Sequence, residues 1–197
     1  MSRHPMTTSS LQQKHMPGET GLWVFILGDM TMFSMFFGVF AYERAHQVLL
    51  FNESQQKLNI TFGAVNTLLL LTGSLCVVLG IEVLRHSAQK NLASKYILFA
   101  FLSGLGFAIN KVFEYGSKIA DGITPETNTF FMYFYSFTGI HLLHLLIGMT
   151  FLFFAWKRAQ RPVLTVKDMR YIENVGIYWH LVDLLWVVLF ALLYLLN

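Results

Sequence analysis

Five stretches of this chain are apolar over about twenty residues, and their length limits the possible folds more than any other feature. They run approximately over 22–42, 60–84, 96–117, 130–156 and 175–196. A helix of about 20 apolar residues crosses the hydrocarbon core of a bilayer. A backbone in lipid must satisfy its own hydrogen bonds, which a helix does within one segment. The sequence therefore predicts an all-α, polytopic membrane bundle with five transmembrane helices.

Composition agrees with a membrane protein and argues against a nucleic-acid partner. Hydrophobic residues make up 55% of the 197 residues and charged residues only 13%, about half the charge of an ordinary soluble domain. The net charge is +3, but the Lys and Arg residues lie mostly between the apolar runs, as in basic membrane loops. Cys76, the single cysteine, excludes an internal disulfide and CxxC chemistry.

The charge distribution predicts an orientation. We expect a polar N-terminal tail over 1–20, without a signal peptide, and one five-helix domain over 21–197. The tail and the second and fourth loops carry ten Lys and Arg residues, whereas the opposite side carries three. Basic residues accumulate on the cytoplasmic side of membrane proteins. The N-terminus is therefore predicted to be cytoplasmic and the C-terminus to lie on the far side.

Apart from Glu82, at the end of the second run, seven acidic, basic or histidine residues lie within the apolar runs, where such groups cost several kcal/mol unless they are paired. They are Asp29, Lys111, Glu114, His141, His144, His180 and Asp183. Asp29 is either a proton-exchanging or ligand-binding group, or an acid that fixes helix packing. Lys111 and Glu114 lie one turn apart, so we expect them to neutralise each other.

The histidines allow two interpretations. His141 and His144, spaced i and i+3, suit a metal or a heme iron if Glu114, His180 or Asp183 supplies further ligands. We favour the alternative of no metal, with both histidines hydrogen-bonded to carboxylates of adjacent helices. His180 and Asp183 are likewise one turn apart, and we expect them to pair with each other or with the fourth span.

The second apolar run combines small and hydroxyl residues with a charged end. Small and hydroxyl side chains over 63–74 predict close helix packing. Glu82 can form a surface ion pair with Arg85 or His86, three and four residues away. A lipid headgroup site is the alternative, and these three residues together with Trp23 are our lipid-binding candidates.

Five motifs follow one another on the five predicted helices. They are GLWVFILGD at 21–29, NTLLLL at 66–71, GLGFAINKVFEY at 104–115, TGIHLLHLLIG at 138–148 and YWHLVDLLW at 178–186. In this order they resemble subunit III of the heme-copper oxidases, the cytochrome c oxidase subunit III family. Asp29 stands where the family has Glu, and Lys111 where it has Gln. These departures and the short, five-span length resemble the NorE-type proteins of nitric oxide reductase gene clusters.

The resemblance implies an accessory subunit with no heme, copper or catalytic site of its own. Subunit III packs beside the catalytic subunit, stabilises it, assists proton uptake and binds phospholipid in a cleft between its first two core helices and the rest. The implied partner is the catalytic subunit of a heme-copper oxidase or nitric oxide reductase, which holds heme with copper or iron. The implied setting is electron transport of aerobic respiration or denitrification in a bacterial inner membrane, with the C-terminus periplasmic.

Two other classes of protein remain alternatives. The first is a small transporter or proton-conducting protein that uses Asp29, Lys111 and Glu114. The second is a metal-dependent membrane oxidase, whose ligands would be His141, His144, His180 and Asp183. Inverted repeats and broken helices would favour a transporter, and the sequence has neither.

Overall fold

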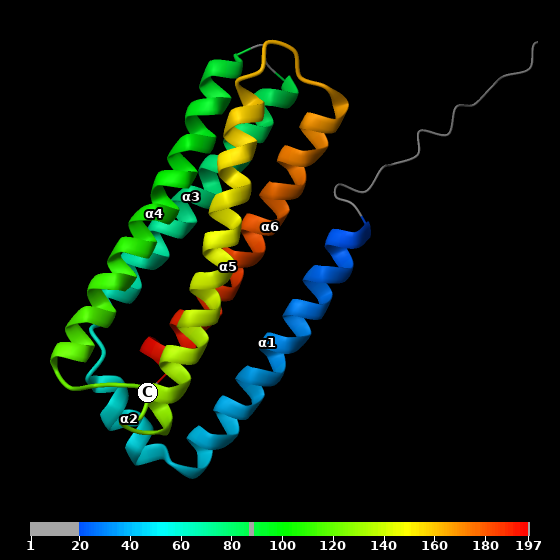
Figure 1. The fold of residues 1–197 in the computed structure, drawn as a ribbon. Coiled ribbons are helices and arrows are strands. Elements are labelled where there is room, and N and C mark those ends of the chain that lie inside the picture. The colour runs from blue at the N-terminus through cyan, green and yellow to red at the C-terminus, as the bar shows by residue number, and fades with distance from the viewer. Residues whose placement is uncertain (1–19, 87–88, 197) are drawn as a thin grey trace, which may run out of the picture.

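The computed structural model describes residues 20–86 and 89–196, which form helices joined by short connections (Figure 1). The helices are α1 (Thr20–His46), α2 (Val48–Gln56), α3 (Ile60–His86), α4 (Lys90–Ala120), α5 (Thr129–Ala159) and α6 (Val166–Phe190), followed by a π-helical turn (Ala191–Leu195). All of the α-helices except α2 are long and apolar enough to cross a membrane. The predicted all-α bundle with five spans is confirmed. The predicted N-terminal tail lies outside the described residues, except for Thr20.

Helix boundaries differ from the prediction mainly at the charged ends. Helix α6 begins at Val166 instead of at 175, and α4 begins at Lys90 instead of at 96. The start of α6 is fixed by a capping box, in which Thr165 Oγ1 accepts from the backbone N–H of Asp168 at 3.1 Å and Asp168 Oδ2 accepts from Thr165 N at 3.1 Å. Hydropathy alone does not detect these first turns because they are charged. The short helix α2 was not predicted.

Helices α3, α4, α5 and α6 form a ring in which each helix contacts two neighbours (Figure 1). Helix α1 stands beside this ring, where it contacts α6 and α2, and its side chains also reach α5. Only 17% of the α1 span is buried, compared with 56% of the α6 span. Helix α6 is therefore the central element of the bundle and α1 the most peripheral span.

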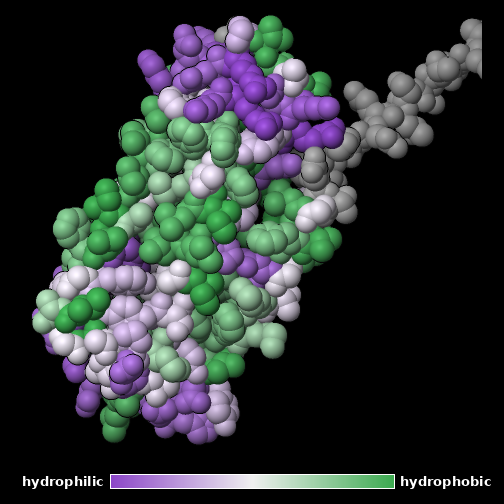
Figure 2. All heavy atoms as spheres, viewed as in Figure 1, coloured by the Kyte–Doolittle hydropathy of each residue, from purple (hydrophilic) through white to green (hydrophobic). Residues whose placement is uncertain are grey.

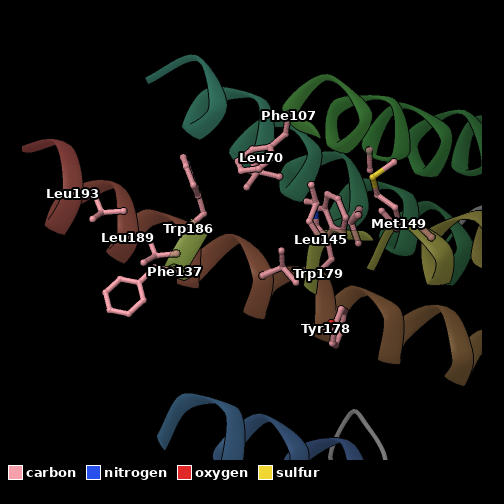
Figure 3. Close-up of a cluster of buried hydrophobic side chains, with 14 of the residues drawn as sticks. Leu70, Phe107, Phe137, Leu145, Met149, Tyr178, Trp179, Trp186, Leu189 and Leu193 are labelled. Atoms are coloured by element: carbon pink, nitrogen blue, oxygen red, sulfur yellow. The ribbon is translucent and has the colours of Figure 1, made fainter. Parts of the chain in front are cut away.

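Two tryptophans of α6 fill the centre of the ring (Figure 3). Trp186 packs edge-on against Phe107 of α4, with ring centroids 4.7 Å apart. Trp179 is fully buried and fits because α4 and α5 carry glycines beside it. A Cβ on Gly104 would lie 2.7 Å from the Trp179 ring, and one on Gly148 would lie 3.3 Å from it. These glycines let α4 and α5 approach the indole closely.

The surface divides into an apolar belt and two hydrophilic ends (Figure 2). The belt consists of large hydrophobic residues on the outer faces of the spans, such as Leu27, Leu68, Val112 and Leu143. One hydrophilic end, at the top of Figure 2, contains the α3–α4 and α5–α6 connections. This distribution agrees with a multi-pass membrane protein.

Candidate functional site

The most enclosed polar cluster joins α4 to the C-terminal turn. Lys111 Nζ is fully buried and donates to Glu114 Oε2 at 2.7 Å and to Tyr194 OH at 3.1 Å. Tyr194 OH in turn donates to Glu114 Oε1 at 2.5 Å. The predicted neutralisation of Lys111 by Glu114 is confirmed. Tyr194 is a partner that the sequence analysis did not single out.

Aromatic rings surround the ammonium group of Lys111. Its Nζ lies 4.8 Å from the ring centroid of Phe134 and 5.0 Å from that of Trp186. A cation within about 6 Å of an aromatic centroid is attracted by the ring quadrupole. Glu114 is only 1% exposed. The arrangement holds an internally neutral pair away from water, which suits a structural role better than ion exchange.

A second polar contact ties α1 to the ring. Asp29 Oδ1 lies 3.1 Å from Nε2 of His144 on α5, and His144 Nδ1 lies 2.9 Å from the carbonyl oxygen of Ile140. Nδ1 must donate to that carbonyl, so Nε2 either accepts from a protonated Asp29 or donates, as imidazolium, to its carboxylate. Both forms have no net charge. The pair therefore satisfies the prediction that a histidine of this span bonds to a carboxylate of another helix.

His141 does not share the interface of His144. It is completely buried, and its ring packs against Phe107 and Trp186, with centroids 5.5 and 5.2 Å away. Neither ring nitrogen has a hydrogen-bond partner. The expectation of a carboxylate partner is therefore wrong for His141. The i, i+3 spacing rotates the two side chains by about 60°, enough to place His144 towards α1 and His141 towards α4 and α6.

The polar pair of α6 faces α3 instead of α5. His180 Nδ1 lies 2.5 Å from Ser74 Oγ, and Asp183 interacts with the same serine. Asp183 is 8% exposed, and its Oδ1 has no hydrogen-bond partner. Of the two predicted pairings, the one between His180 and Asp183 is supported, because the two side chains interact electrostatically. Their hydrogen-bond partner is Ser74 of α3 and not a residue of the fourth span, because α6 turns this face towards α3.

Further hydrogen bonds link polar residues of the run 63–74 on α3 to neighbouring helices. Thr67 Oγ1 accepts from Trp186 Nε1 at 3.0 Å, and Asn66 Oδ1 accepts from Asn110 Nδ2 at 2.7 Å. These contacts confirm the packing role predicted for the run 63–74. Their partners were missed because they lie far away in the sequence.

The lipid-binding candidates do not form one site. Arg85 pairs with Glu173 of α6, with Nη2 and Oε1 2.7 Å apart, while Glu82 Oε1 lies 3.3 Å from Nε2 of His86. Glu82, Arg85 and Glu173 line a groove of about 200 Å³ between α3 and α6, which also contains His180. His86 and Trp23 do not line this groove.

The candidate metal ligands are distributed over three different interfaces. Among residues 20–86 and 89–196, no three His, Cys, Asp or Glu side chains are grouped so that they could hold a metal ion. The metal-dependent oxidase therefore gains no support from the geometry.

The sequence of the chain matches a known protein family. The model of the family "Cytochrome c oxidase subunit III" matches residues 8–197. The chain belongs to this family. The predicted resemblance is thereby confirmed, and it indicates a subunit III of a heme-copper oxidase that partners a catalytic oxidase subunit.

Individual relatives are distant but similar over most of their length. "Cytochrome bo(3) ubiquinol oxidase subunit 3" of Buchnera aphidicola (strain APS) is 25% identical over 175 residues, covering 89% of this chain and 84% of the relative. "Cytochrome c oxidase subunit 3" of Thermostichus vulcanus is 29% identical over 178 residues, covering 90% and 86%. The protein of the same name from Synechocystis is 27% identical and covers 98% and 88%. The family relation extends over the whole five-span domain.

Proposed function

We propose that this chain is an accessory subunit without a catalytic site, which stabilises the catalytic subunit of a heme-copper oxidase or a related nitric oxide reductase. The family match is supported by the way the bundle uses its polar groups. Lys111, Glu114, His144 and His180 all bond to residues of the same chain. The outer faces of the spans are apolar, so they offer a partner a surface within the membrane.

The proposed setting is a bacterial inner membrane, with the N-terminus cytoplasmic and the C-terminus periplasmic. The catalytic partner would hold the heme and the copper or iron. Oxygen and nitric oxide are alternative substrates of that partner, and the NorE-type assignment corresponds to nitric oxide. In either case the chain would serve respiratory or denitrifying electron transport through its partner and not through a cofactor of its own.

Purification from native membranes tests the partnership. Tagged protein in mild detergent should co-elute with a catalytic oxidase or reductase subunit and its heme absorption bands, and mass spectrometry would identify that subunit. Deleting the gene should lower the yield or durability of the reductase activity but leave the heme spectrum unchanged. A colourless preparation without such a subunit, or an altered heme spectrum after deletion, would contradict the proposal.

We also propose that the groove between α3 and α6 binds a phospholipid headgroup. Arg85 is the phosphate-binding candidate, because its side chain is 44% exposed even though it pairs with Glu173. Arg85→Gln should reduce the phospholipid that remains bound after purification. Arg170→Gln is the matched control, because Arg170 is exposed on α6 and does not line the groove. Equal retention in both variants would exclude this headgroup site.

A further inference from the structure

Helix α1 changes in burial part-way along its length. None of the residues 21–28 is buried, whereas Asp29, Phe33 and Phe40 are each at most 8% exposed. These three buried side chains meet α5, α6 and α2, respectively. We call residues 21–28 the arm of α1 and residues 29–46 its body. The body is packed against the rest of the chain, and the arm is not buried by it.

The arm joins the body at a glycine. Gly28 is the last residue of the arm, and nothing in the described part of the chain lies within 4 Å of its Cβ position. Gly63 of α3 and Gly104 of α4 differ in this respect, because an aromatic ring lies 2.7 Å from each Cβ position. A glycine in a helix allows the backbone more conformations than any other residue. Close packing accounts for the glycines inside the ring, whereas Gly28 leaves the backbone of α1 easier to bend.

Two hydroxyl side chains near Gly28 bond to carbonyl groups of the same helix. Thr31 Oγ1 donates to the carbonyl oxygen of Leu27 at 2.7 Å, and Ser34 Oγ donates to that of Met30 at 2.7 Å. Such bonds to the carbonyl four residues earlier often bend helices. In lipid, serine and threonine side chains also satisfy backbone groups that a bend at glycine releases. The Leu27 carbonyl therefore keeps a hydrogen-bond donor when the helix bends at Gly28.

The other open glycine of α1 lies in a different setting. Gly38 also has nothing within 4 Å of its Cβ position in the described part of the chain. However, Phe33 and Phe40 are both 1% exposed and hold the helix on either side of it. A bend at Gly38 would pull one of these rings out of its packing, whereas a bend at Gly28 moves only residues that are not buried.

We propose that Gly28 is a hinge about which the arm swings away from α6, while the body of α1 stays fixed to the ring. In the position seen here, Phe25 of the arm lies against Tyr178 of α6, with ring centroids 6.1 Å apart. Tyr178 OH donates to the carbonyl oxygen of His144 at 3.2 Å, so Tyr178 lies beside the Asp29–His144 contact. The arm is thus a lid over Tyr178. The hinge belongs to this chain alone and does not rest on the accessory role.

Pulsed electron paramagnetic resonance of the full chain in lipid vesicles tests the hinge. One spin label replaces Phe99, which is exposed on α4, across the ring from α1 (Figure 1). The second replaces either Val24 of the arm or Met35 of the body, both exposed, with Cys76 changed to alanine. The distance distribution should be broader for Val24 than for Met35. Gly28→Ala should narrow the Val24 distribution to the width found at Met35, because alanine fits the open space but restricts the backbone.

Gly38→Ala is the matched control, because it adds the same methyl group to α1 in an equally open position. It should leave the Val24 distribution unchanged. Thr31→Val keeps the shape of the side chain but removes its bond to the Leu27 carbonyl, so it should narrow the Val24 distribution. Circular dichroism should give the same helix content for all variants, since the arm stays helical as it swings.

Three outcomes would overturn the proposal. Equally narrow distributions at Val24 and Met35 would show that α1 is rigid throughout its length. Equally broad distributions would show that α1 moves as a whole. Equal effects of Gly28→Ala and Gly38→Ala on the Val24 distribution would place the bend elsewhere in the helix.

Discussion

Lys111 is an unusual residue for the interior of a membrane helix, since its side chain is 0% exposed at membrane depth. An unpaired lysine at the centre of a bilayer costs at least ~2.5–3.5 kcal/mol. Here Glu114 neutralises the charge, Tyr194 bonds to both residues, and aromatic rings face the ammonium group. The residue is therefore tolerable only as part of this network.

The first prediction concerns the loss of one member of that pair. Glu114→Ala should destabilise the chain by about 3–5 kcal/mol, because it leaves a buried ammonium without a counter-charge. Lys111→Met should lower the free energy of unfolding by a similar amount, because it leaves the buried Glu114 carboxylate without a counter-charge. The double variant should be much less destabilised than the sum of the two. SDS unfolding followed by circular dichroism measures all three.

Lys95→Met is the matched control for this cycle. Lys95 lies exposed near the start of the same helix, so its replacement should change the free energy of unfolding by less than ~0.5 kcal/mol. Additive effects of Lys111→Met and Glu114→Ala would show that the two side chains do not interact, contrary to the structure.

The sequence predicts polar contacts within one helix better than contacts between helices. Lys111 and Glu114 are one turn apart, so their pairing follows from helical geometry alone. Tyr194 is 80 residues from Glu114, and its position depends on how α6 packs against α4. The predicted carboxylate partner of His141 was wrong for a related reason. A spacing of one turn does not determine which neighbouring helix each side chain meets.

At the scale of elements, α1 is the span whose attachment is weakest. Apart from Asp29 and His144, its contacts with the ring are mainly aromatic and aliphatic, such as Phe33 against Leu181 and Leu185. Apolar contacts give little preference for helix association in lipid, because the lipid chains are equally apolar. The Asp29–His144 hydrogen bond should therefore contribute strongly to the position of α1.

The second prediction removes that hydrogen bond. Asp29→Ala should loosen α1, whereas Asp29→Asn should largely retain its position, because an amide can still bond to His144. Spin labels at Met35 of α1 and Leu143 of α5, both exposed, report the separation by pulsed electron paramagnetic resonance, with Cys76 replaced by alanine. A broader distance distribution in Asp29→Ala alone is expected. Identical distributions in both variants would assign the attachment of α1 to its apolar contacts.

The third prediction concerns the packing of α4 against α6. Gly104→Ala places a Cβ 2.7 Å from the Trp179 ring and 3.2 Å from Met149. Such overpacking typically costs about 1–3 kcal/mol. Gly116→Ala is the matched control on α4, because nothing lies within 4 Å of its Cβ position. It should be neutral or stabilising by up to ~1 kcal/mol through helix propensity.

Thermal unfolding in detergent separates these two glycine variants. A lower midpoint for Gly104→Ala but not for Gly116→Ala is expected. Equal midpoints would mean that Trp179 can move aside without loss, and that the close approach of α4 is not required for the fold.

Hydropathy located the membrane-crossing elements well but not their ends. All five spans were found because the apolar requirement of lipid acts on every residue of the crossing segment. The start of α6 was missed because Lys167, Asp168, Arg170 and Glu173 lie in its first turns. Helix α2 was missed because its nine residues are half polar, and its position depends on packing against α5.

At the scale of the whole molecule, the two ends of the bundle differ in charge. The end with the α3–α4 and α5–α6 connections is hydrophilic (Figure 2). Its sequence is rich in basic residues, which include Lys90, Lys95, Lys157, Arg158 and Arg161. Some of them also have structural contacts. Arg161 pairs with Asp168 at 2.8 Å, and Lys90 donates to the carbonyl oxygen of Pro162 at 2.6 Å. The first contact ties the α5–α6 connection to the start of α6, and the second ties it to the start of α4.

The fourth prediction is the orientation of this basic end. Basic loops stay on the cytoplasmic side during insertion, so Gln160 should face the cytoplasm and Glu126, in the α4–α5 connection, the periplasm. Both residues are exposed, whereas Cys76 is buried in a span. A membrane-impermeant maleimide added to intact spheroplasts should therefore label Glu126→Cys but not Gln160→Cys. Both variants should react after lysis, which controls for their accessibility. The reverse pattern would invert the bundle and place its basic end on the periplasmic side.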